Sequence, residues 1–397
     1  MTKRILIFSL VYYPRFIGGA EVAVKEITQR IAEADTTFDL IALRLDHTLA
    51  TYERVGNVNV YRVGYAGKQR DSSDSLPVWL HFNKYLYPFL ACVKACSLYR
   101  KRKYDAVWAI MANYSGFAAL FFKCIHRRVP FLLTLQEGDP VTYIKHRVRF
   151  VYPLFRLIFT CADYIQTISY YLADFARSMG VQAPIAVVPN GVNVTLFSDL
   201  QGVGRAEQRR KLGIQDNEKV IITTSRLVIK NAVGDIIASL RYLPERVKLL
   251  IIGTGYLEQS LRKQAASYQL QHRVSFLGFI PHDALPEYLH AADIFCRPSL
   301  SEGFGNSFIE AMAAGLPVIT TPVGGIVDFL RDKETGLFCK VGDPKSIADA
   351  VLLLEEQPAL REAIISSARR MVEQKYDWDI VAKQMRAVFE KSITNKR

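Results

Sequence analysis

The stretch SLSEGFGNSFIEAMAAGLP, residues 299–317, decides how the second half of the chain folds. It follows an apolar run at 294–297 with the composition of a buried strand, and leads through glycines into a segment at 307–314 with helical apolar spacing. A strand, a glycine loop and a helix in this order predict one unit of a parallel α/β sheet. The free backbone N–H groups at the start of such a helix favour a bound anion.

Strands and helices also alternate along the rest of the chain, which at 397 residues is long enough for two domains. The alternation restarts after Pro189-Asn190-Gly191, so we expect a doubly wound, Rossmann-like domain over 1–190 and a second one over 191–377. A helix at 378–395 could cross back to the first domain. The expected strands lie at residues 4–14, 38–43, 58–63, 106–110, 130–135, 164–167, 185–188, 219–225, 247–253, 274–277, 294–297 and 317–320.

The opening stretch holds two carboxylates, each of which has a chemical and a structural interpretation. Glu302 precedes Gly-Phe-Gly at a strand end, where open α/β sheets bind their ligands. A carboxylate there could accept hydrogen bonds from sugar or ribose hydroxyls. Ser307-x-x-Glu310 matches a capping box, in which Glu310 would serve only the helix start. Both interpretations of Glu310 stay open.

The Glu302-x7-Glu310 tract resembles that of glycosyltransferase family 4, whose members are retaining enzymes. The resemblance implies the GT-B fold: two facing Rossmann-like domains with an interdomain cleft and a C-terminal crossover helix. Further matches occur in the order of the family's motifs and reach from residue 5 to about 345. They are GGAE at 18–21, PNGVN at 189–193, SRLVIKN at 225–231, GTG at 253–255, VSFLG at 274–278 and TGL at 335–337.

The resemblance implies roles for the matching residues. Arg226 and Lys230 would hold the donor diphosphate, and their spacing after a strand would let both charges converge on it. Glu302 would bind sugar hydroxyls and Glu310 the ribose, while the backbone at 278–280 would read the base. The resemblance places these residues at the donor: Gly18, Gly19, Asn190, Gly253, Gly255, Gly278, Phe279, Ile280, Gly303, Phe304, Gly305, Asn306, Ser307 and Glu310. The structural alternatives are solvated charges at a helix start for the cations and a tight turn for Gly18-Gly19.

The chain departs from the family after the strand at 130–135. Many members carry a histidine near the reacting sugar there, whereas this chain has Gln136, Glu137 and Asp139. Either Gln136 or Glu137 replaces the histidine, or its role is absent. All three are candidates on the acceptor or sugar side.

The resemblance therefore implies a metal-independent, retaining hexosyltransferase that uses a UDP- or GDP-sugar and a saccharide or lipid-linked acceptor. Such an enzyme would serve cell-surface polysaccharide or glycolipid synthesis and would need no cofactor. No Asp-x-Asp occurs in a plausible donor loop, so we expect no metal. The alternatives are a sugar-nucleotide epimerase of the same fold and a non-catalytic, basic protein that binds nucleic acid. Intact Arg226, Lys230, Glu302 and Glu310 argue against an inert protein, and we expect no nucleic-acid partner.

Six scattered cysteines without a metal-binding spacing favour a cytoplasmic protein with reduced thiols in its core. Cys92 and Cys96 could share a helix face, but a metal site would need two more ligands. The cysteines are Cys92, Cys96, Cys124, Cys161, Cys296 and Cys339.

The net charge of +13 is concentrated in residues 1–190, which carry an excess of ten basic residues. Within them, residues 143–159 mix Lys145, Arg147, Arg149 and Arg156 with aromatic side chains. This composition is typical of a segment that docks on an anionic membrane surface, here the cytoplasmic face. The alternative is a helix whose rings belong to the core. No apolar run reaches the roughly 18 residues needed to span a bilayer.

Overall fold

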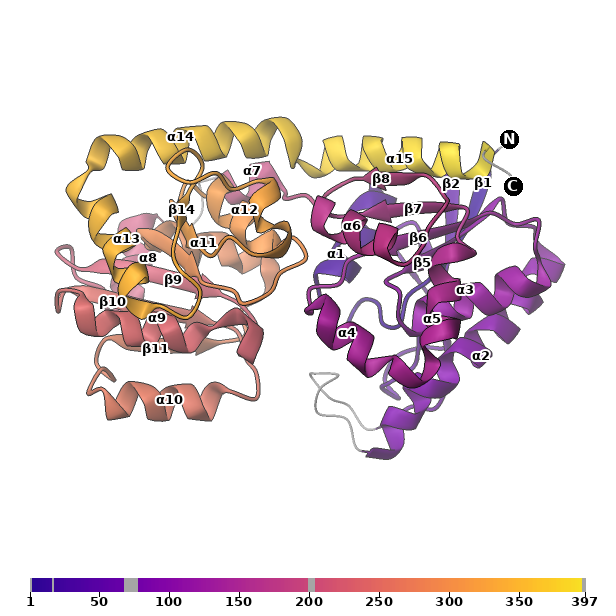
Figure 1. Ribbon diagram of the computed structural model, residues 1–397, viewed down its shortest axis with the longest axis horizontal. Coiled ribbons are helices and arrows are strands. Elements are labelled where there is room, and N and C mark those ends of the chain that lie inside the picture. The colour runs from indigo at the N-terminus through magenta and orange to yellow at the C-terminus, as the bar shows by residue number, and fades with distance from the viewer. Residues whose placement is uncertain (1, 16–17, 68–77, 199–203, 395–397) are drawn as a thin grey trace. The chain divides into compact units, whose positions relative to one another are not determined.

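The chain forms two α/β units, seen in a computed structural model that describes residues 2–15, 18–67, 78–198 and 204–394. The N-terminal unit runs to Asn190 and includes the last helix, α15 (Trp378–Thr394), while the C-terminal unit is Gly191–Asp377 (Figure 1). Residue 395, the expected end of the last helix, lies outside the described residues. Each unit has a parallel sheet with helices on both faces, which is a Rossmann-like architecture.

The sheet of the N-terminal unit has the order β3-β4-β2-β1-β5-β6-β7-β8. Its strands are β1 (Lys3–Phe8), β2 (Thr36–Leu43), β3 (Tyr52–Val55), β4 (Val58–Val63), β5 (Ala106–Ile110), β6 (Phe131–Leu135), β7 (Tyr164–Thr167) and β8 (Ile185–Val187). The pairings are parallel except that β3 runs antiparallel to β4 at the sheet edge. β3 was not among the expected strands, because an exposed edge strand needs no apolar run.

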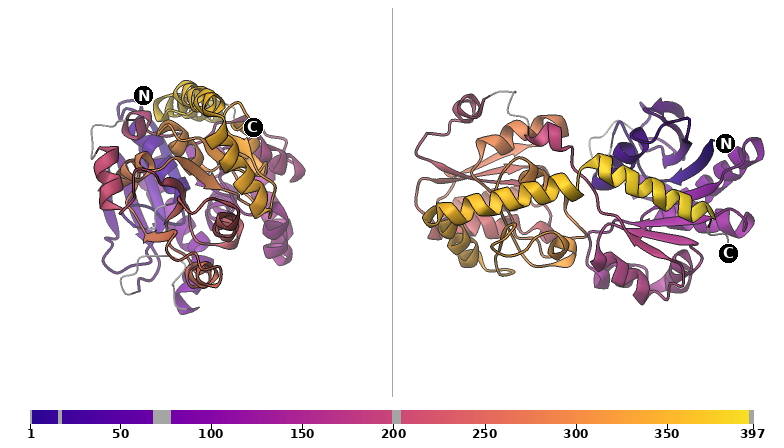
Figure 2. Two further views of the ribbon diagram at one scale, coloured as in Figure 1. Left: turned by 90° about the vertical axis from the view of Figure 1, so that its left-hand side faces the viewer. Right: turned by 90° about the horizontal axis from the view of Figure 1, so that it is seen from above.

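Both faces of this sheet are covered, and the side chains of β1 alternate between them. Ile5 and Ile7 belong to the cluster under α1 (Gly19–Gln29) and α15, while Phe8 packs on Phe122 of α3 (Tyr114–Ile125). On the first face, Phe389 of α15 lies edge-on to Trp108, with ring centroids 4.9 Å apart. Figure 2 shows α15 lying along this unit. The remaining helices are α2 (Val78–Lys101), α4 (Val141–Arg147), η2 (Arg149–Val151), α5 (Tyr152–Thr160) and α6 (Tyr170–Ser178).

The C-terminal unit has a parallel sheet in the order β11-β10-β9-β12-β13-β14. Its strands are β9 (Lys219–Thr224), β10 (Val247–Ile252), β11 (Val274–Gly278), β12 (Ile294–Arg297), β13 (Val318–Thr320) and β14 (Leu337–Phe338). Its helices and 3-10 turns are α7 (Val194–Ser198), α8 (Arg205–Lys211), η3 (Ile229–Asn231), α9 (Val233–Ser239), η4 (Leu240–Tyr242), α10 (Glu258–Ser267), η5 (His282–Ala284), α11 (Leu285–Ala291), α12 (Asn306–Ala313), η6 (Gly324–Asp328), α13 (Pro344–Glu356) and α14 (Pro358–Lys375).

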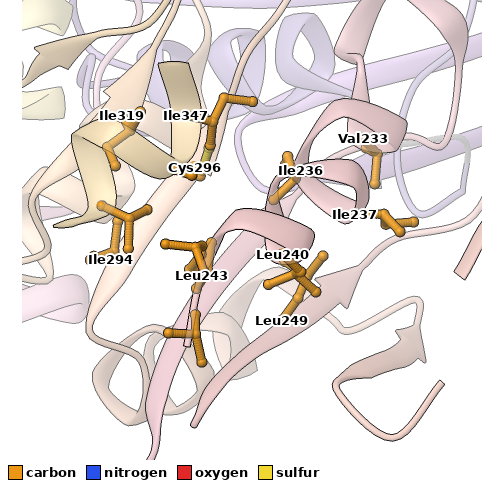
Figure 3. Close-up of a cluster of buried hydrophobic side chains, with 14 of the residues drawn as sticks. Val233, Ile236, Ile237, Leu240, Leu243, Leu249, Ile294, Cys296, Ile319 and Ile347 are labelled. Atoms are coloured by element: carbon orange, nitrogen blue, oxygen red, sulfur yellow. The ribbon is translucent and has the colours of Figure 1, made fainter. Parts of the chain in front are cut away.

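Two apolar layers hold this unit together. On one face, α9, α10 and α13 pack on the strands through a cluster that includes Ile236, Leu249 and Ile347 (Figure 3). On the other, the aromatic rings of Phe304, Phe308, Phe329 and Tyr376 form a second cluster. Phe304 belongs to the loop that opens α12, so its packing in this cluster fixes where that loop sits.

Candidate functional site

The loops at the carboxyl edge of the C-terminal sheet form one connected surface. Backbone hydrogen bonds join each loop to the next in the order of the strands from β11 to β13. These bonds run from Gly253 N to Gly278 O (2.7 Å), from Leu227 N to Thr254 O (2.9 Å), from Leu300 N to Lys230 O (2.7 Å) and from Gly325 N to Glu302 O (3.0 Å). The structure therefore brings the candidate residues after β9, β10, β11 and β12 to one edge, where open α/β sheets bind ligands.

The two candidate cations lie on the loop after β9. Arg226 is exposed and Lys230 is partly buried in η3. The backbone between them is fixed, because Asn231 Nδ2 donates to Arg226 O at 2.7 Å and Lys230 O accepts from Leu300 N. A fixed backbone with two cationic side chains at a sheet edge is suited to a diphosphate.

The glycines near this loop allow close contact between backbones. A Cβ atom at Gly253 would lie 1.9 Å from Ser225 O, and one at Gly255 would lie 2.3 Å from Leu227 O. Gly324 approaches Glu302 O in the same way, again at 1.9 Å from an added Cβ. No side chain fits at these distances. Glycine at 253 and 255 is therefore needed for the position of the Arg226 loop, and glycine at 324 for the position of the Glu302 loop.

Glu302 is held by Arg297, a residue that our sequence analysis did not single out. Glu302 Oε2 accepts from Arg297 Nη2 at 2.6 Å, and the two side chains are only 14% and 8% exposed. Arg297 Nη1 also donates to Ser307 Oγ at 2.7 Å. The only sequence signal for this role was a charged residue at the end of the apolar strand β12.

The capping-box interpretation of Glu310 is wrong. Gly305, with φ of +95°, is the N-cap of α12, so the helix already begins at Asn306 and Ser307 lies inside it. Ser307 Oγ accepts from Arg297, and Glu310 Oε1 instead contacts His282 Nε2 at 2.9 Å. No spacing in the sequence relates His282 to Glu310, because the contact arises from the packing of η5 against α12.

The remaining donor candidates divide by exposure. The ring of Phe304 is buried and packs on Phe329 and Tyr376, so this ring belongs to the core, whereas Gly305 and Asn306 of the same loop are partly exposed. Phe279 is 74% exposed and follows Gly278, whose φ is +71°, while Ile280 is partly buried. The segment proposed to read the base is therefore accessible at the end of β11.

In the N-terminal unit, the glycine pair stands at the start of α1. Gly18 and Gly19 are both exposed, and Gly18 N donates to Glu21 Oε2 at 2.8 Å. Gly18 is the N-cap of this 11-residue helix. The pair thus forms a tight turn, as the structural interpretation expects. Its exposed backbone also remains accessible to a ligand.

The three residues after β6 lie in different environments. Glu137 is buried, and its Oε1 accepts from Ala112 N at 2.6 Å, which joins the ends of β5 and β6. Burial raises the pKa of Glu137 to about 7, against the opposing effect of the Ala112 N–H donor. Gln136 Oε1 accepts from Asn190 Nδ2 at 3.3 Å, and Asp139 is partly buried. Gln136 is thus the more accessible candidate for the missing histidine.

Within the part of the chain that the structure describes, no group of three or more His, Cys, Asp or Glu side chains could hold a metal ion, and no helix is long and apolar enough to cross a membrane. All six cysteines are free thiols. Cys124 is exposed near the C-terminal end of α3, so the expectation of core cysteines is wrong for it.

The basic segment at 143–159 combines core and surface side chains. It forms α4, η2 and α5, in which Phe155 and Phe159 are buried while Phe150 is 85% exposed. Leu154 and Leu157 are also exposed. Two of its rings therefore belong to the core, and one helix face remains apolar toward solvent.

Two family models match the chain, and together they span most of it. Residues 18–191 match the glycosyl transferase 4-like domain, and residues 204–371 match glycosyl transferases group 1. These segments fall in the N-terminal and C-terminal units respectively.

Several known proteins resemble this chain in sequence or in structure. An uncharacterised glycosyltransferase of Methanocaldococcus jannaschii is 28% identical over 96% of both chains. The GDP-mannose-dependent monoacylated alpha-(1-6)-phosphatidylinositol monomannoside mannosyltransferase of Corynebacterium glutamicum is 30% identical over 59% of this chain and 64% of that protein. The crystal structure of Anabaena HepE in complex with UDP-glucose superposes with a TM-score of 0.77, at 19% identity and over 98% and 99% of the two chains.

Proposed function

Because the chain belongs to the family 4 type of glycosyltransferases with the GT-B fold, we propose that it transfers a hexose from a UDP- or GDP-sugar with retention of configuration. The acceptor in this proposal is a saccharide or a lipid-linked saccharide, and no metal ion takes part. The reaction would serve the synthesis of a cell-surface polysaccharide or glycolipid.

One observation carries the proposal: the carboxyl-edge loops of the C-terminal unit place two cations, a held carboxylate and a helix start along one connected edge. Arg226 and Lys230 supply positive charge, Glu302 supplies hydrogen-bond acceptors, and the backbone at the start of α12 supplies N–H donors. A nucleotide sugar presents a diphosphate and sugar hydroxyls, which are the groups that such an edge can bind.

The chemistry follows from where charge develops. When the bond to the sugar breaks, negative charge grows on the leaving nucleoside diphosphate. Arg226, Lys230 and the N–H groups at the start of α12 would stabilise that charge and lower the barrier. In this proposal the cations take the place of a metal ion, and a donor phosphate oxygen takes the proton of the acceptor. Glu302 orients the sugar through its hydroxyls.

The choice between uridine and guanosine nucleotides rests on relatives. The Corynebacterium relative is GDP-mannose-dependent, and HepE binds UDP-glucose. Product analysis by NMR with both donors, in the presence of EDTA, tests the proposed reaction: an α-linked product from an α-linked donor supports it, and a β-linked product contradicts it.

We also propose that the N-terminal unit docks reversibly on an anionic membrane, where a lipid-linked acceptor would be found. Helices α2, α3, α4, η2 and α5 contain nine Lys and Arg residues and no Asp or Glu. Together with this charge, α2 exposes one apolar stripe at helical spacing. The stripe consists of Phe82, Tyr85, Leu86, Phe89 and Val93.

Ring contacts connect this stripe to the basic segment through α3. Phe89 stacks on Phe121 of α3 at 5.1 Å, and Phe117 of α3 lies 6.5 Å from Phe155 of α5. Cations for lipid headgroups and apolar side chains for the interface thus occur on neighbouring helices. The apolar stripe on α2 adds to the basic segment that the sequence indicated.

We expect the protein to bind vesicles that contain anionic lipid, with binding weakened by salt. Replacing Lys145, Arg147 and Arg149 by Ser should weaken binding by about a hundredfold, at about 1 kcal/mol for each charge. The double variant Phe82→Ser/Val93→Ser should also bind less, whereas Tyr242→Ser/Val341→Ser, at exposed positions of the C-terminal unit, should bind normally. Cosedimentation of each variant with the vesicles measures the binding. Equal binding to neutral and anionic vesicles, or none to either at low salt, would contradict membrane docking.

A further inference from the structure

Arg297 links the loop of Glu302 to the first turn of α12 in the candidate donor site. Its guanidinium donates through Nη2 to Glu302 and through Nη1 to Ser307 on the first turn of α12. The same group lies 4.2 Å over the ring of Phe308. Gly305 leaves the space for it, because a Cβ there would lie 2.9 Å from Arg297 Nη2.

Burial of the Arg297 guanidinium by itself destabilises the folded protein. Arg297 is buried at the end of β12, and a charge removed from water destabilises a protein unless it is fully paired. Among the described residues, Arg297 Nε is buried without a hydrogen-bond partner, so the pairing is incomplete. An apolar side chain would end a buried strand without these costs.

The charges around Arg297 come from the candidate site. Burial lowers the pKa of Arg297, while the carboxylates of Glu302 and Glu310 act in the opposite direction. One buried cation is therefore close enough to be influenced by both carboxylates of the tract. Glu302 is further fixed by its own loop, where its Oε1 accepts from Gly303 N at 3.2 Å.

We propose that Arg297 is a positioning residue for the sugar of the donor, because it fixes Glu302 and ties the Glu302 loop to the start of α12. This inference rests on the proposed function. It means that the contacts of Glu302 with the sugar and of α12 with the diphosphate are set relative to one another by a single side chain. Loss of Arg297 should then weaken the affinity for the nucleotide sugar and leave the affinity for the nucleoside diphosphate nearly unchanged.

The test compares calorimetric affinities for UDP and GDP with those for UDP-glucose and GDP-mannose. In Arg297→Lys, whose single ammonium cannot replace the planar fork, we expect at least a tenfold loss of affinity for the nucleotide sugar that the wild type binds. Affinity for the matching nucleoside diphosphate should change less than threefold. Glu302→Gln should behave alike, and the double variant should lose much less than the product of the two single losses, because both changes break the contact between Arg297 and Glu302.

A matched control is Arg209→Lys, since Arg209 is as buried as Arg297, at 7% exposure, but bonds to Ala291 O and Gln215 O. It should leave both affinities unchanged. If Arg297→Lys does not fold, Ser307→Ala removes only the link to α12 and should still weaken nucleotide-sugar binding severalfold.

Unchanged nucleotide-sugar affinity in Arg297→Lys would overturn the inference, and so would unchanged affinity in Ser307→Ala if Arg297→Lys does not fold. Equal losses of affinity for the diphosphate and the nucleotide sugar would also overturn it. So would additive losses in the double variant. A wild-type protein that binds neither UDP nor GDP would instead contradict the proposed function.

Discussion

Replacing Arg226 and Lys230 together by Ala should reduce the rate of sugar transfer by roughly a thousandfold or more, since removal of even one group that stabilises developing charge costs roughly a hundred- to a thousandfold. The two cations lie on the loop after β9, whose backbone is bonded to the loops after β10 and β12. The loop should therefore keep its place in the variant while losing its charge.

The same variant should lose the stabilisation that a nucleoside diphosphate gives. For the wild type, UDP or GDP at a hundred times its dissociation constant should add about 2.7 kcal/mol to the free energy of unfolding. The matched control is Arg210→Ala/Lys263→Ala, which removes two exposed cations from α8 and α10. Thermal unfolding with and without nucleotide measures the effect. Wild-type transfer and stabilisation in the Arg226/Lys230 variant would show that these cations do not hold the diphosphate.

Glu137→Gln should stabilise the protein relative to the wild type increasingly as the pH rises. The pKa of Glu137 is raised from 4.5 to about 7 by burial, so the folded protein holds its proton more tightly than the unfolded chain does. Between these two values unfolding releases a proton, and the wild type loses stability with rising pH. Above pH 7 the loss is complete and is on the order of 3 kcal/mol, at about 1.4 kcal/mol for each pKa unit.

Gln removes the ionisation and keeps an oxygen for the Ala112 N–H. The difference in unfolding free energy between Glu137→Gln and the wild type should therefore grow between pH 4.5 and 7 and then stay constant. Denaturant unfolding over this range measures it. Glu373→Gln, which alters an exposed carboxylate on α14, is the control and should give a flat difference. A flat difference for Glu137→Gln as well would mean that Glu137 is ionised in the folded protein without penalty.

Much of the fold could be predicted from the sequence, because the sequence of a buried parallel strand is a short apolar run. The run at 219–225 is an example, since β9 occupies Lys219–Thr224 at the centre of the second sheet. The edge strand β3 could not be predicted, because its solvated residues carry no apolar pattern. The helix α14 was also missed, since few of its side chains are buried.

The candidate site shows where sequence patterns stop being informative. The loops that carry Arg226 and Glu302 could be placed at one sheet edge, because parallel strands all point the same way. The partners of the two carboxylates could not be predicted. Arg297 reaches Glu302, and His282 reaches Glu310, only through the packing of separate elements. The capping box failed for a local reason, since the left-handed Gly305 is the N-cap of α12, two residues before Ser307.

Donor turnover followed by ¹H NMR in EDTA tests the central claim most directly. The protein would be given UDP-glucose or GDP-mannose with a saccharide or lipid-linked acceptor, after removal of metal ions. We predict transfer from one of these α-linked donors, with the new glycosidic bond also in the α configuration and with an undiminished rate in EDTA. A β-linked product, or activity that disappears in EDTA and returns with Mg²⁺ or Mn²⁺, would contradict retaining, metal-independent transfer.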